Sequence, residues 1–133
     1  MAKSVLVVEP QLTLKSLWES VLRDAGFYVR GVTDGLSALA AMQIEPVNLV
    51  IVDVRIRDVD GYRLCGAARK LSDNNKVPVI VVTDDNLLMA QTKAHAAGAQ
   101  EVMRLPTNHR EAAKFIADLP LTCHRLLASA PPG

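Results

Sequence analysis

An α/β domain built on a mostly parallel sheet is the fold that this sequence predicts. Short apolar runs alternate along the chain with longer segments of helical period, as in a series of β–α units. Three of the runs are almost entirely β-branched residues and leucine, which is typical of strands buried on both faces. The second run alternates and the fifth carries charge, so we predict that these two form the sheet edges. The runs are, in order, 5–8, 27–32, 49–52, 77–82 and 101–105.

Five segments that follow the runs have the spacing of amphipathic helices. They lie around 14–22, 36–42, 62–71 and 86–97, and from 108 onward. Gly98 follows the fourth segment in the position of a C-terminal cap, and Asn108 precedes the fifth as an N-cap. Pro120 interrupts the fifth pattern, so we expect one domain over residues 1–119 and a tail or linker over 120–133, part of it helical. Whether this tail is a linker, a packing element or a dimer contact is left open.

Composition sets limits on the partners of this domain. The chain has 133 residues, of which 50% are hydrophobic, enough for one continuous core. The formal net charge of +1 gives no overall field toward nucleic acid or a membrane surface, and the apolar run at 5–8 is too short to span a bilayer. Cys65 and Cys123 lack metal-ligand spacing and are expected to be reduced thiols. We therefore expect a cytoplasmic protein that binds no nucleic acid directly and no membrane.

Candidate site residues follow the predicted strands at their carboxyl ends. In an open parallel sheet, this edge is where ligands bind. Glu9 follows the first run, Asp53 follows the third, and Thr83 and Asp84 follow the fourth. No glycine-rich phosphate loop follows the first run, and no serine lies in a nucleophile-elbow motif. We expect neither dinucleotide binding nor hydrolase chemistry, and we do not expect an enzyme.

Ordered motifs carry a family resemblance over residues 3 to about 118. They are Val5–Glu9, Leu49–Asp53 followed by Asp60 and Gly61, Val79–Thr83, and Gly98–Ala99 leading to Leu105 and Pro106. The chain thereby resembles the receiver domain of bacterial response regulators. The resemblance implies a flavodoxin-like doubly wound fold, with five parallel strands in the order 2-1-3-4-5. It also implies a role in two-component or phosphorelay signalling.

The resemblance assigns expected roles to the candidate residues. Asp53 stands at the position of the phospho-acceptor, and Thr83 at that of the hydroxyl that binds the phosphoryl group. Glu9 and Asp53 match two ligands of the divalent ion that neutralises the product. The second acidic position after the first strand is Pro10, however, which has no side-chain oxygen to offer Mg²⁺. We expect metal binding to be weak or absent and no cofactor to be required.

Other positions depart from the family pattern in ways that oppose phosphorylation. Leu105 stands where the family has a lysine, and Val102 where it has an aromatic switch residue. Asp84 adds negative charge where a phosphoryl group would arrive. Arg55 offers one compensation, since its guanidinium folding over Asp53 would replace the missing cation. The alternative is that Arg55 is a solvated loop residue.

Two functions follow from these residues. The first is a pseudo-receiver that acts by protein–protein interaction, with impaired Mg²⁺-dependent phosphorylation. The second is a true phospho-acceptor, phosphorylated on Asp53 by a histidine kinase through a rearranged pocket. In either case we expect a protein partner on the face formed by the fourth helix, fifth strand and fifth helix. A histidine kinase, an output domain and a second copy of the chain remain open as that partner.

Overall fold

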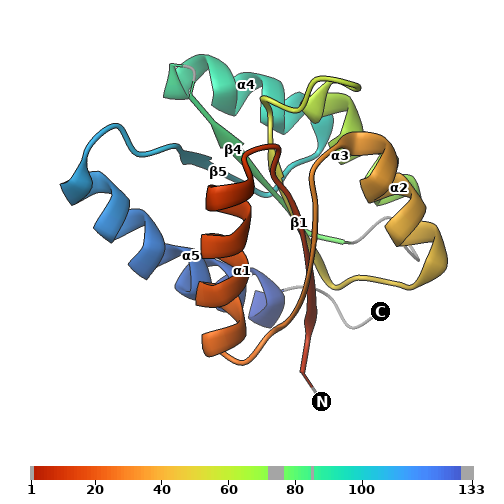
Figure 1. Cartoon of the computed structure of the whole chain (residues 1–133). Coiled ribbons are helices and arrows are strands. Elements are labelled where there is room, and N and C mark those ends of the chain that lie inside the picture. Colours follow the sequence, from red (N-terminus) through yellow and green to blue (C-terminus); the bar gives the residue numbers. More distant parts are fainter. Residues whose placement is uncertain (1, 72–76, 85, 130–133) are drawn as a thin grey trace.

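The predicted strands and helices are present in the structure, a computed structural model that describes residues 2–71, 77–84 and 86–129. Strands and helices alternate strictly along these residues (Figure 1). Their bounds are β1 Ser4–Val8, α1 Leu12–Asp24, β2 Tyr28–Val32, α2 Gly35–Ile44, β3 Leu49–Asp53, α3 Gly61–Leu71, β4 Val79–Thr83, α4 Leu87–Ala97, β5 Glu101–Arg104 and α5 His109–Ser129.

The sheet has the predicted strand order. Its five parallel strands run β2-β1-β3-β4-β5, and both predicted edge strands lie at the edges. Val7 pairs with Ile51 and Val52 with Val81 in the registers of the central strands. Because β3 and β4 are buried along their whole length, their runs of Val, Ile and Leu contact helices on both faces.

Alternate residues of the strands supply two separate cores. Val5 and Val7 of β1 face the core that includes α1 and α5, where Trp18 and Phe115 are buried. Leu6 and Val8 face the opposite core, which includes residues of α2, α3 and α4. Figure 1 shows α1 and α5 together on one side of the sheet and α2 and α3 on the other. This layering leaves the carboxyl ends of the strands free to form a site.

Two helix ends lie at the residues that predicted them, Gly98 and Asn108. The Asn86 side chain accepts hydrogen bonds from the N–H groups of Leu88 and Met89, and Gly98 ends α4 in the left-handed region with φ 89°. Asn108 likewise caps α5 by accepting from the N–H of Glu111, at 2.9 Å. These caps satisfy backbone groups that the helices leave unpaired at their ends.

The fifth helix is longer than we expect from the sequence. Pro120 lies inside α5, which continues to Ser129, so the prediction that Pro120 interrupts the helix is wrong. Leu119, Cys123 and Leu126 recur at helical spacing and are buried in the core against α1. Burial of this stripe outweighs the one helical hydrogen bond that proline cannot donate. The first two turns of the expected tail therefore pack onto the domain.

Candidate functional site

Three buried polar residues meet at the carboxyl edge of the sheet. Glu9 follows β1, Asp53 ends β3 and Thr83 ends β4, and all three are fully buried, with 0% of their surface exposed. A charged or polar side chain at this depth requires partners, because burial without them is costly. The sequence predicted that these positions lie at one edge of the sheet, and the structure places them there.

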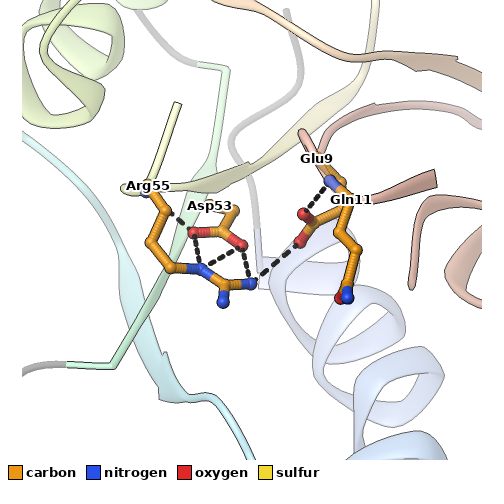
Figure 2. Close-up of polar contacts among 4 residues, drawn as sticks. All are labelled: Glu9, Gln11, Asp53 and Arg55. Carbon is orange, nitrogen blue, oxygen red and sulfur yellow. Dashed lines mark hydrogen bonds and ion pairs between the residues drawn. The ribbon is translucent and has the colours of Figure 1, made fainter. Parts of the chain in front are cut away.

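Arg55 supplies the main partner of Asp53. Its Nε lies 3.1 Å from both carboxylate oxygens, and its Nη2 lies 2.7 Å from Oδ2. The backbone N–H of Arg55 also donates to Oδ1 of Asp53 at 2.8 Å. Figure 2 shows the guanidinium lying across the carboxylate and between the side chains of Asp53 and Glu9. Of the two placements that the sequence left open for Arg55, the structure has the one over Asp53.

Glu9 has fewer hydrogen-bond partners than Asp53. Its Oε2 accepts a hydrogen bond from the backbone N–H of Gln11 at 2.8 Å. Its Oε1 has no hydrogen-bond partner within the described part of the chain and lies 3.8 Å from Nη2 of Arg55. Burial, together with the neighbouring Asp53 carboxylate, raises the pKa of Glu9 from 4.5 to about 8. Burial beside Asp53 therefore favours the neutral, protonated form of Glu9 in the folded protein.

The pKa of Asp53 shifts in the opposite direction. Burial by itself would raise the pKa of Asp53, but the hydrogen bonds from Arg55 outweigh it and lower the pKa below its ordinary 3.8. Asp53 in turn raises the pKa of the Arg55 guanidinium, with smaller contributions from Glu9 and Asp84. The site thus favours an ionised Asp53–Arg55 pair beside a protonated Glu9. Such a charge-assisted, forked pair is stronger than a neutral hydrogen bond.

Comparison with known proteins decides the family. A model of the response regulator receiver domain matches residues 5–117. The chain belongs to this family. Protein PilG of Pseudomonas aeruginosa is 26% identical to this receiver domain over 107 residues, which are 80% of this chain and 79% of PilG. Regulatory protein VanRc of Enterococcus gallinarum is 28% identical over 111 residues, which are 84% of this chain and 47% of VanRc.

Solved structures of receiver domains share the fold. A putative response regulator from Chloroflexus aurantiacus superposes with a TM-score of 0.83 at 26% identity, covering 96% of this chain and 99% of that one. Chemotaxis protein CheY4 of Vibrio cholerae gives a TM-score of 0.79 at 25% identity, covering 95% and 99%. This chain spans only 33% and 47% of the length of two of the regulators that it matches.

The residues of this receiver domain do not fit a resident Mg²⁺ ion. Pro10 brings no side-chain oxygen, and the guanidinium of Arg55 lies between the carboxylates of Glu9 and Asp53 (Figure 2). Within residues 2–71, 77–84 and 86–129, no group of three acidic, histidine or cysteine side chains is placed to hold a metal. A hard cation needs several oxygen ligands. Arg55 instead provides the positive charge at this position.

The remaining departures from the family pattern lie around this pair. Asp84 is exposed just after β4, and its negative charge contributes to the raised pKa of Arg55. Leu105 is buried in the core on the side of α1 and α5, whereas Val102 packs against the opposite core. Leu105 carries no charge and cannot replace the lysine, and Val102 has no ring to replace the aromatic residue. Thr83 is buried where the sequence places it, and its backbone oxygen accepts the N–H of Leu105 at 2.7 Å.

Some contacts around the site are not predicted by the sequence. Asp58 accepts the N–H groups of Gly35 and Leu36 at 2.9 Å each, so it caps α2 from the loop after β3. Because these residues are 22 or more positions apart, only the folded loop reveals the contact. The sequence signal for this cap is Asp58 itself, an aspartate in the loop two positions before Asp60. A small apolar pocket beside Arg55 was also missed.

Both cysteines are free thiols, as expected. Cys65 and Cys123 are buried, and burial raises the pKa of each thiol to about 12. Across the described residues, no helix combines the length and hydropathy needed to cross a bilayer.

Proposed function

We propose that this receiver domain acts in two-component signalling as a pseudo-receiver, which binds a protein partner and is not phosphorylated efficiently on Asp53. The observation that carries the proposal is the forked Arg55–Asp53 pair. Oδ1 of Asp53 lies 2.8 Å from the backbone nitrogen and 3.1 Å from Nε of Arg55, and Oδ2 lies 2.7 Å from Nη2. Both oxygens are therefore engaged before any phosphodonor arrives.

Phosphoryl transfer to Asp53 would need two changes at this site. Attack on phosphorus requires a free carboxylate oxygen in line with the leaving group, so Arg55 would have to release at least one oxygen. The transferred phosphoryl group also needs cations around it, usually a metal ion with its bound oxygens. Pro10 and Leu105 supply no charge of either sign here.

The proposed partner surface is the face formed by α4, β5 and α5. The first turn of α4 exposes three consecutive large apolar side chains, Leu87 at 40%, Leu88 at 73% and Met89 at 60%. Apolar side chains grouped on a surface favour a protein contact. Within the same face, an ion pair between Glu101 and Arg125 ties β5 to α5. We propose that a histidine kinase, an output domain or a second copy of the chain docks on this face.

The same proposal covers location and chemistry. We place the protein in the cytoplasm, in keeping with the two unpaired thiols, Cys65 and Cys123. We propose that it is not an enzyme and that it contacts neither nucleic acid nor membrane directly, in keeping with the net charge of +1.

The phosphorylation half of the proposal is tested with acetyl phosphate and, separately, beryllofluoride, each with Mg²⁺ in the millimolar range. We expect intact mass spectrometry to find no phosphoryl adduct and the amide spectrum around Asp53 to stay unchanged. An adduct that is present in the wild type and absent in Asp53→Asn would contradict the proposal. It would establish the second function, a phospho-acceptor, which the burial of Asp53 and Thr83 at one sheet edge favours.

The docking half is tested with a matched pair of surface variants. Leu88 and Ile44 are each 73% exposed, but Ile44 lies at the end of α2, away from α4. We expect Leu88→Glu to reduce binding to the partner by more than tenfold, as for a residue central to an interface, and Ile44→Glu to leave it unchanged. Sedimentation equilibrium of both variants decides whether the partner is a second copy. Equal effects of the two variants on partner binding would contradict the proposal that this face is the docking surface.

A further inference from the structure

A pocket between α1 and α5 opens beside the Arg55–Asp53 pair. Its volume is about 290 Å³, and Trp18, Leu105, Phe115 and Ile116 line it together with Arg55. This volume is at the lower end of the roughly 300–1,000 Å³ typical of small-ligand pockets. The pocket is therefore suited to a ligand smaller than a nucleotide.

Arg55 is a charged residue in the otherwise mostly apolar lining of the pocket. Arg55 uses Nε and Nη2 to hold Asp53, and Nη1 donates no hydrogen bond within the described part of the chain. In Figure 2, this terminal nitrogen carries no dashed line. The exposed Gln11 also lines the pocket. A guanidinium binds a carboxylate best when its nitrogens are held in place, as these are by Asp53.

We propose that this pocket binds a small organic monoanion, whose apolar body fills the space between α1 and α5 and whose carboxylate pairs with Nη1 of Arg55. The walls favour a compact aromatic or branched body, since Trp18 and Phe115, whose ring centroids are 5.5 Å apart, both line the pocket. Leu105 contributes to this apolar wall at the position where the family has a lysine. The inference rests on the proposed function in one respect, that Arg55 stays beside Asp53.

Binding at this position would affect the site itself. The bound carboxylate and Asp53 would share one guanidinium, so the ligand changes how strongly Arg55 holds Asp53. The pseudo-receiver would then respond to a metabolite in place of a phosphoryl group. The chemistry identifies only the class of ligand, an apolar body with one carboxylate.

The probe for this site is 3-phenylpropionate, with its neutral amide, 3-phenylpropanamide, as the charge control. Trp18 is the only tryptophan of the chain and lines the pocket, so its fluorescence reports binding directly, and calorimetry gives the affinity. We expect saturable binding of the acid at millimolar or lower concentration. The amide should bind about tenfold more weakly or worse, because it loses the charge-assisted contact with Arg55.

Two variants locate the site, with one matched control. Ala112→Leu fills the pocket from α5, whereas Ala113→Leu, the next residue of the same helix, adds the same side chain outside the pocket on an exposed position. We expect Ala112→Leu and Arg55→Gln each to weaken binding of 3-phenylpropionate at least tenfold, and Ala113→Leu to leave it unchanged. Ala112→Leu keeps the test informative should Arg55→Gln fail to fold.

The outcomes separate this inference from the proposed function. No saturation by 3-phenylpropionate, equal binding of acid and amide, or unchanged binding by Ala112→Leu would each overturn the pocket assignment. None of these outcomes bears on phosphorylation. A phosphoryl adduct on Asp53 would overturn the pseudo-receiver proposal while leaving the binding result as measured.

Discussion

Arg55 reaches back over two residues to bind both carboxylate oxygens of Asp53, with its own backbone N–H donating 2.8 Å to Oδ1. The contact is local to the turn that follows β3. An aspartate that accepts the N–H two residues on forms a turn of its own, which brings the following side chain back toward it. The position of the Arg55 guanidinium over Asp53 is therefore set by this short loop.

Removal of the Arg55 side chain should destabilise the domain. Arg55→Ala leaves the buried Asp53 with a backbone donor but no cation, and 39% of the Arg55 side chain is exposed, which lessens the loss. We expect the free energy of unfolding in urea to fall by ~2 kcal/mol near neutral pH. Arg57→Ala, an exposed arginine of the same loop, should change it by less than ~0.5 kcal/mol.

The stability that Arg55→Ala loses should depend on pH. The pKa of Asp53 is lowered in the folded protein, so its stabilisation is present above its ordinary value of 3.8 and is lost as the pH falls through the folded value. The difference between wild type and Arg55→Ala should therefore shrink at acidic pH. A difference that stayed constant down to about pH 2 would show that Arg55 acts through packing alone.

Glu9 should make the protein less stable as the pH rises. The pKa of Glu9 is about 8 when folded and 4.5 ordinarily, so over this window the unfolded chain releases a proton that the folded chain keeps. The associated stability is fully present below 4.5 and is lost by about pH 8. Glu9→Gln has no such titration, and we expect it to exceed wild type by ~2 kcal/mol or more at about pH 8.

Urea unfolding at about pH 5 and about pH 8 measures the Glu9 effect. Glu45→Gln, at the C-terminal cap of α2, is the control for loss of a carboxylate elsewhere. The Gln11 N–H that donates to Glu9 can donate equally to a glutamine oxygen, so the substitution keeps this contact. Identical pH profiles for wild type and Glu9→Gln would rule out a buried neutral Glu9.

The strand order and the positions of Glu9, Asp53 and Thr83 could be predicted from the sequence for a simple reason. Runs of β-branched residues specify strands buried on both faces, and parallel strands bring their carboxyl ends to one edge. The two helix-end residues Gly98 and Asn108 act through their own backbone or neighbours, so sequence position alone identifies them. In each case, residues close together in the sequence are sufficient for the prediction.

Other features depend on the folded arrangement and could not be predicted. A pattern of residues gives no means of choosing between an Arg55 in solvent and one over Asp53, since the turn geometry decides it. The cap that Asp58 gives to α2 joins loops far apart in the chain. The pocket beside Arg55 exists only where α1 and α5 fail to fill the space between them.

Two glycines of α3 should respond in opposite directions to alanine. A Cβ on Gly66 would meet no atom within 4 Å, whereas a Cβ on Gly61 would lie 2.8 Å from the backbone Cα of Val54. We expect Gly66→Ala to stabilise the fold by ~0.5–1 kcal/mol through helix propensity. Gly61→Ala should destabilise it by ~1–3 kcal/mol through overpacking. Thermal and urea unfolding check both, and equal changes would refute the close approach to Val54.

The continuation of α5 past Pro120 should be required for stability. Cys123 and Leu126 are 0% and 7% exposed in the core shared with Trp18 and Phe115, although both lie beyond the domain boundary that the sequence suggests. Leu126→Ala should cost ~2–4 kcal/mol in unfolding free energy, since it leaves a cavity in this core.

Leu121→Ala is the matched control, because Leu121 is 66% exposed on the same helix. It should change the unfolding free energy by less than ~0.5 kcal/mol. A chain ending at residue 119 loses the buried side chains of both Cys123 and Leu126, and burial of one leucine alone is worth ~1.5–3 kcal/mol. We therefore expect the truncated chain to be less stable than Leu126→Ala. Full stability of the truncated chain would instead restore the boundary at residue 119.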